Sequence, residues 1–252
     1  SAGNITLAAS HTLTTTGNVT ATNNVALAGG NITNSGNVSG ANVSLASSNN
    51  GTINNTGRVN GTNVNVATGG NLTNSGNVTA TGNVSASAGN VTNSGNITGA
   101  GATNVTAANN GTISNNGTIG AAGNTTLNGG NITNGPSTGA SIGSANGNTT
   151  VAANGTLTNN GTIAGTNVTT SSTGNLTNAG NITGTNTNVT GGNITGSGNV
   201  TASNNLTMNA TAGNLTVANA SAGNITLAAS NTLTTTGNVT ATNNVALNGG
   251  NI

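Results

Sequence analysis

Residues 63–80 read NVNV-ATGG-NLTNSG-NVTA, and residues 24–40 read NVAL-AGG-NITNSG-NVSG in the same frame. In each stretch, three pieces place Val, Ile or Leu between polar residues, which is the period-2 pattern of a β-strand with one buried face. Glycine and asparagine separate the pieces, and both residue types tolerate the positive φ angles of tight corners. These stretches therefore predict three short strands joined by sharp corners.

Both stretches belong to a repeat of about 20 residues. An Asn followed by an aliphatic residue or Thr marks the start of each unit, at Asn4, Asn24, Asn42, Asn63, Asn83, Asn104, Asn124, Asn148, Asn167, Asn188 and Asn205. Such a period with short strands is typical of a solenoid, in which each unit forms one coil stacked on the next. Because Gly, Asn and Thr are weak helix formers, the sequence predicts an all-β chain.

A longer repeat contains these units. Residues 1–32 recur at 221–252 with two differences, His11 against Asn231 and Ala28 against Asn248. The long repeat therefore spans residues 1–220, and 221–252 begin the next, nearly identical copy. We expect one continuous segment over 1–252, a parallel β-helix (β-solenoid) with about 20 residues and three short strands per coil, in which corner Asn residues stack into side-chain ladders.

The composition removes most kinds of functional site. The 252 residues include no Asp, Glu, Cys or aromatic residue, one Arg, one His and one Pro, and the formal net charge is +1. Catalysis draws mainly on carboxylates, imidazoles, thiols and amines, so we expect no enzyme, no cofactor and no metal site. Without a basic field or aromatic rings, nucleic acid is not an expected partner. No apolar run is long enough to span a membrane.

The phrases GNITNSGNV at 30–38 and GNLTNSGNV at 70–78 resemble the haemagglutinin repeats of filamentous-haemagglutinin-type exoproteins. The resemblance extends over essentially all eleven units. It implies a right-handed parallel β-helix that is secreted through the two-partner pathway of Gram-negative bacteria and displayed as a surface fibre or adhesin. The location it implies is extracellular or on the bacterial cell surface.

Three features interrupt the repeat. His11 is the only imidazole, but the next copy has Asn231 there, so a structural role is expected. Arg58 replaces the Asn found at matching positions, and we expect an outward, solvated side chain. The only proline lies in the longest unit, and Gly135, Pro136 and Ser137 are predicted to form an exposed loop, because proline cannot donate to a strand ladder.

Asn-x-Thr and Asn-x-Ser triplets recur along the chain and have the form of N-glycosylation acceptors. They also arise from the strand pattern alone, since Asn and Thr flank an inward aliphatic residue. A rod with almost no net charge has little electrostatic repulsion against association, and glycans would supply steric separation. The possible acceptors are Asn31, Asn37, Asn71, Asn77, Asn90, Asn96, Asn175 and Asn181.

The function that fits best is a structural shaft of an extracellular fibre or adhesin. Its expected partners are coaxial copies in a longer filament, laterally associated copies, covalent glycans and an unidentified surface receptor. One alternative is an ice-binding solenoid that uses outward Thr and Asn ladders, such as the pairs at residues 71 and 73 or 90 and 92. A polysaccharide-binding β-helix is another, although the charged and aromatic residues that such sites use are missing.

Overall fold

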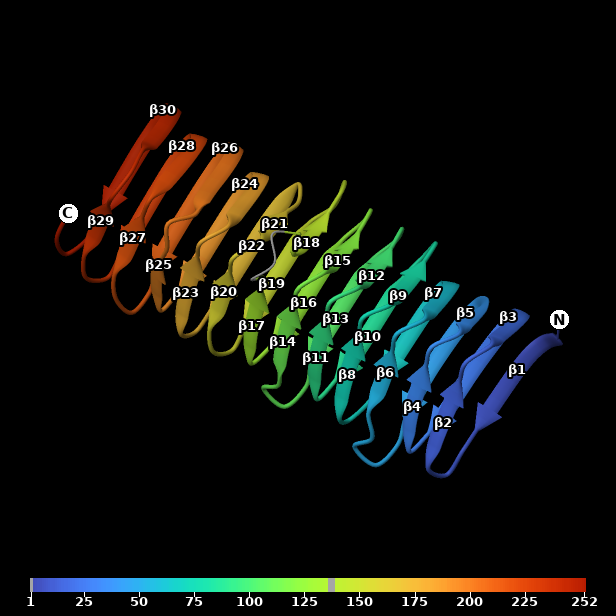
Figure 1. The fold of residues 1–252 in the computed structure, drawn as a ribbon. Helices are drawn as coiled ribbons and strands as arrows, with labels where there is room; N and C mark the ends of the chain where they lie inside the picture. Colours follow the sequence, from blue (N-terminus) through green and yellow to red (C-terminus); the bar gives the residue numbers. More distant parts are fainter. Residues whose placement is uncertain (1, 136–138) are drawn as a thin grey trace.

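The computed structural model describes residues 2–135 and 139–252, which form parallel strands stacked as a β-solenoid of about 13 turns with roughly 19 residues each (Figure 1). These described residues contain no helix. The two ends of the chain lie at opposite ends of the stack (Figure 1). The predicted all-β solenoid is therefore confirmed, with a coil close to the expected length.

One side of the solenoid is a sheet of twelve short strands, one from each successive coil (Figure 1). Its strands are β2 (Thr12–Thr15), β4 (Asn31–Asn34), β6 (Ile53–Asn55), β8 (Asn71–Asn74), β11 (Asn90–Asn93), β14 (Thr112–Asn115), β17 (Asn131–Asn134), β20 (Leu157–Asn159), β23 (Asn175–Asn178), β25 (Asn193–Thr195), β27 (Leu215–Val217) and β29 (Leu233–Thr235).

The other sides belong to an eighteen-stranded sheet that bends around the coil. In the middle of the chain each coil contributes two short strands to it, whereas toward both ends these two merge into one long strand. The strands are β1 (Ala2–Ala8), β3 (Asn18–Gly29), β5 (Asn37–Ser47), β7 (Arg58–Ala67), β9 (Asn77–Ala80), β10 (Val84–Ala88), β12 (Asn96–Gly99), β13 (Thr103–Ala107), β15 (Thr118–Ala121), β16 (Thr125–Gly129), β18 (Ser141–Ser144), β19 (Thr149–Ala153), β21 (Thr162–Ala164), β22 (Asn167–Ser172), β24 (Asn181–Gly191), β26 (Asn199–Ala210), β28 (Asn219–Ala229) and β30 (Val239–Asn248).

The coils stack in register, so like residues lie over like residues. Asn71 pairs with Asn90, and Leu72 pairs with Val91 on the next strand. On the other sheet, Leu27 pairs with Leu45. The inward Val, Ile and Leu side chains form one buried cluster along the solenoid, as their alternation predicts. Burying one such side chain contributes about 1.5–3 kcal/mol, which offsets the entropy lost when the coil is ordered.

Most corner glycines allow close packing of neighbouring coils and do not adopt unusual dihedral angles. We expected positive φ at the corners, but in the described residues it occurs only at Asn49, Asn50, Asn109, Asn110, Gly135 and Gly196. The corner glycines instead stack on one another along the axis. A β-carbon at Gly76 would collide with the carbonyl oxygen of Gly57, and one at Gly57 with that of Gly36. The expectation is therefore wrong for most corners, where lack of space selects glycine.

Two of the predicted unit starts are displaced by two residues. Asn104 pairs with Ser85, and Asn188 pairs with Thr169, so neither continues the column of unit-start asparagines. The displacement arises because threonine fills some inward positions that we assigned to aliphatic residues. Thr103 is fully buried, and its hydroxyl donates to the carbonyl oxygen of Gly120 at 2.7 Å. With the hydroxyl satisfied, the remaining methyl group packs as a valine methyl would.

Candidate functional site

Eight asparagine side chains stack inside the solenoid, at the ends of consecutive strands of the twelve-stranded sheet. Each is at most 4% exposed, and the amide nitrogen of one donates to the amide oxygen of the next at 2.7–2.9 Å. We call this column the inner amide ladder; its members are Asn34, Asn55, Asn74, Asn93, Asn115, Asn134, Asn159 and Asn178.

Asn93 illustrates how one rung is satisfied. Its amide oxygen accepts from Asn74 at 2.8 Å, and its amide nitrogen lies 2.8 Å from the amide oxygen of Asn115. The same nitrogen also donates to the backbone carbonyl oxygens of Gly95, at 3.0 Å, and Thr118, at 3.1 Å. Buried amides are costly unless paired, and here the donors and acceptors of neighbouring coils meet only when the coils stack in this register.

The expected corner ladders exist, but our sequence reasoning did not predict this buried column. The signal is present in the alternation: in the segment 31–34 the second and fourth residues face inward, so Asn34 shares the buried side with Ile32. Thr15 begins the column, and its hydroxyl donates to the amide oxygen of Asn34 at 2.7 Å.

A second column, the outer amide ladder, follows the bend of the eighteen-stranded sheet. Its side chains are exposed, and each amide nitrogen donates to the previous coil, for example from Asn42 to Asn24 at 3.1 Å. The linked members are Asn4, Asn24, Asn42 and Asn63, and then Asn148, Asn167, Asn186, Asn205, Asn224 and Asn244. Two shallow grooves, of about 450 and 320 Å³, follow these two runs.

The outward side of the twelve-stranded sheet carries two regular columns. One is a mixture of Asn and Thr, and several of its members bond to one another; Thr112, for example, donates from its hydroxyl to the amide oxygen of Asn90 at 3.1 Å. The other column is almost entirely threonine. It consists of Thr14, Thr33, Asn54, Thr73, Thr92, Ser114, Thr133, Thr158, Thr177, Thr195, Thr216 and Thr234.

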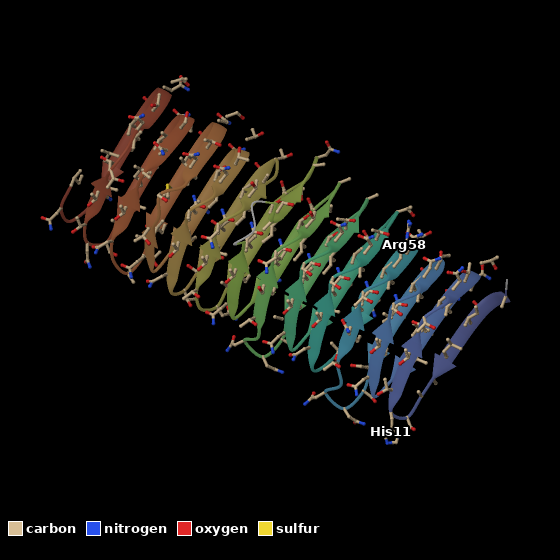
Figure 2. The ribbon with its side chains drawn as sticks, viewed as in Figure 1. His11 and Arg58 are labelled. Carbon is tan, nitrogen blue, oxygen red and sulfur yellow. The ribbon has the colours of Figure 1, made fainter. Side chains whose placement is uncertain are left out.

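The two charged or titratable side chains of the chain do not form a site. His11 is exposed, and its Nδ1 lies 3.0 Å from the hydroxyl of Ser10. Arg58 is also exposed and pairs in register with Asn37 and Asn77, as predicted. The two lie at opposite edges of the solenoid in Figure 2. In the described parts of the chain, no three His, Cys, Asp or Glu residues group as metal ligands would.

The predicted exposed loop is wrong at its first residue. Gly135 is buried with a φ of 104°, and its N–H donates to the carbonyl oxygen of Asn115 at 2.8 Å. This hydrogen bond continues the ladder of β17 by one residue, which keeps Gly135 against the coil. Pro136 and Ser137 lie outside the described residues. The next described strand, β18, begins at Ser141 and belongs to the eighteen-stranded sheet.

The possible glycan acceptors all lie on outward positions. Asn37 is half-buried, and the other seven are exposed. The amide nitrogens of Asn90 and Asn96 already donate to the coils before them, at 3.0 and 2.7 Å. Glycosylation of these residues stays a prediction.

Comparisons with protein-family models, with curated proteins and with solved structures found no match. Among the described residues, no helix has the length and apolar character needed to cross a membrane.

Proposed function

We propose that this chain is a shaft segment of an extracellular fibre or adhesin, with a mechanical rather than a catalytic role. The observation that carries the proposal is the unbroken stack: every coil pairs in parallel with the coils before and after it, over one continuous buried cluster. In such a solenoid the required contacts are between neighbouring coils, so length is added by duplication without redesign. The near-verbatim repeat of residues 1–32 at 221–252 fits that mode of growth.

The surface chemistry supports the same role. A shaft must be stiff and must stay folded over a range of salt concentrations. Its outward residues are mainly Asn, Thr, Ser and Gly. These side chains are uncharged, so salt does not weaken their interactions by screening. The amide ladders add hydrogen bonds along the axis to those of the backbone. The resemblance of residues 30–38 and 70–78 to haemagglutinin repeats supports a secreted, surface-displayed bacterial protein.

Recombinant chains with one, two and three copies of the 220-residue repeat test the shaft. Stacked coils lie about 4.8 Å apart, so electron microscopy should show rods that lengthen by roughly 50 Å per copy at constant width. Globular beads joined by linkers, or widening without lengthening, would refute a coaxial shaft.

The extracellular location needs a separate test. Antibodies against the segment should label intact producing cells, with filaments visible by immunogold microscopy. Labelling that requires permeabilised cells would place the protein inside and remove the fibre proposal, whatever the rod length.

A further inference from the structure

The outward side of the twelve-stranded sheet, here called the threonine face, is uniform along the solenoid. Its strands follow one another in a straight row (Figure 1), and ten of the twelve positions in one column are threonine. Both columns are uncharged, whereas Arg58 projects from the bent sheet. The face is thus a regular, neutral array with the spacing of a parallel sheet, about 4.8 Å.

The two columns of the threonine face differ in their hydrogen bonding. In the part of the chain that the structure describes, none of its ten threonines bonds to another protein group through its hydroxyl. The neighbouring column differs, because Thr52, Thr112 and Thr156 each donate to an Asn of the previous coil. Several members of one column are therefore hydrogen-bonded within the molecule, while the threonines of the other present free hydroxyl and methyl groups.

We propose that two copies of this chain pair side by side through their threonine faces. A second copy is the occupant whose spacing matches, because its columns repeat with the same coil-to-coil distance over the whole length. Parallel, in-register sheets with small side chains and Asn ladders can interdigitate as steric zippers, and this face has both features. Such an isologous contact uses the same patch twice and closes at two copies.

Charge and area both permit this contact. The whole chain has a formal net charge of +1, so two copies meet almost no electrostatic repulsion. Twelve strands of three or four residues cover on the order of 700 Å² per copy, close to the roughly 800 Å² per partner of specific complexes. A single coil would contribute too little, and the contact gains strength as coils are added.

The bent sheet is a poorer candidate for the same contact. On one of its sides the outward column changes from Thr98 to Gly120 and Gly143, which leaves a hollow of about 350 Å³. The other side carries the two grooves along the outer amide ladder. Neither side offers twelve equivalent positions, so pairing should be confined to the threonine face.

Sedimentation velocity over a concentration series, with small-angle scattering of the same samples, tests the pairing. We expect a monomer–dimer equilibrium in which the dimer keeps the length of the monomer and gains width. Dissociation should change less than twofold between low and high salt, because the contact is uncharged. A protein that stays monomeric at all accessible concentrations, or a dimer of doubled length, would overturn the proposal.

Matched lysine variants locate the contact. Thr92→Lys with Thr177→Lys places two charges on the threonine face, and we expect dimerisation at least tenfold weaker, because charges must be desolvated in the contact. Thr98→Lys with Thr162→Lys places the same charges on the bent sheet and should change the dissociation constant by less than twofold. Both pairs replace outward threonines, and thermal unfolding checks that each variant is folded. Equal weakening by both pairs, or by neither, contradicts the assignment.

Ice is the competing occupant of a regular threonine array. A monomeric protein that inhibits ice recrystallisation, and loses this activity in Thr92→Lys with Thr177→Lys but not in the control pair, would assign the face to ice and overturn pairing.

Discussion

The coils from β4 to β23 and those from β25 to β29 fill the same interior position in different ways. In the first region the position is always asparagine, and the side chains form the inner amide ladder. In the second it is Gly196, which has no side chain, then the buried Val217, then Thr235, which is exposed in the last coil. The backbone register continues across the boundary, where Leu176 pairs with Ile194.

This difference separates the stacking of coils from the choice of register between them. Val217 is 2% exposed, so an aliphatic side chain fills the position as completely as an amide does. Stacking of coils therefore does not require the ladder. A buried amide, however, is satisfied only when the next coil supplies its partner, so a slip of the chain would orphan several amides at once. We infer that the ladder region is held to one register more strictly than the region after it.

Asn93→Asp should give the largest effect within the ladder. The new carboxylate would replace a buried donor and face the Asn115 amide oxygen and the carbonyls of Gly95 and Thr118. We expect local opening of the coils around β11 to become easier by about 3–5 kcal/mol at neutral pH. At acid pH the loss should shrink, because the neutral carboxyl group again carries a donor. Hydrogen exchange of strands β8 to β14 against pH measures both, and a loss independent of pH would contradict this account.

Asn93→Val places in the inner amide ladder the residue type that Val217 provides in the second region. It should reduce stability less than Asn93→Asp does. The variant introduces no charge, but it leaves the amide oxygen of Asn115 without its donor, while the amide nitrogen of Asn74 keeps the carbonyl oxygens of Gly76 and Asn96. An unsatisfied buried group costs about 1–3 kcal/mol, so we expect a loss of roughly 2 kcal/mol. The same exchange measurement applies. Stability equal to that of the parent would mean that the ladder contributes nothing beyond the volume it fills.

Asn178→Val tests the boundary and should have a smaller effect. Asn178 accepts from Asn159 at 2.7 Å but has no further rung, and its nitrogen makes only a 3.4 Å bond to the carbonyl of Asn199. We expect a loss of about 1 kcal/mol, seen as faster exchange in β23 and β25. If this variant loses as much stability as Asn93→Val, the contribution of a ladder asparagine does not depend on how many hydrogen-bond partners it has.

His11→Asn should be the smallest change. The next copy of the repeat has Asn231 there, and His11 is exposed. Thermal unfolding should shift by less than the equivalent of about 0.5 kcal/mol. A larger shift would give the Ser10–His11 contact a structural role that its exposure does not suggest.

The coarse fold could be predicted because neighbouring coils repeat both the alternation and the spacing. Positions such as Ile32 and Val38 lie inward as the period-2 pattern requires. The predicted unit starts at Asn104 and Asn188 are wrong because the period-2 pattern treats threonine as an outward, polar residue. Thr103 and Thr187 are instead buried, and their hydroxyls are hydrogen-bonded. The inner ladder was missed for the same reason, since a polar residue at an inward position is stable only with partners from two other coils, and those become visible once the register is known.

The two amide ladders point in opposite directions along the axis. In the inner ladder each nitrogen donates toward the C-terminal coils, as from Asn34 to Asn55, and in the outer ladder toward the N-terminal coils, as from Asn42 to Asn24. Amide groups are electric dipoles, so the two columns oppose each other. Added length therefore contributes less electric moment along the axis than two ladders pointing the same way would contribute. Parallel and antiparallel placement of two such rods side by side therefore differ less in electrostatic energy than they would with aligned ladders.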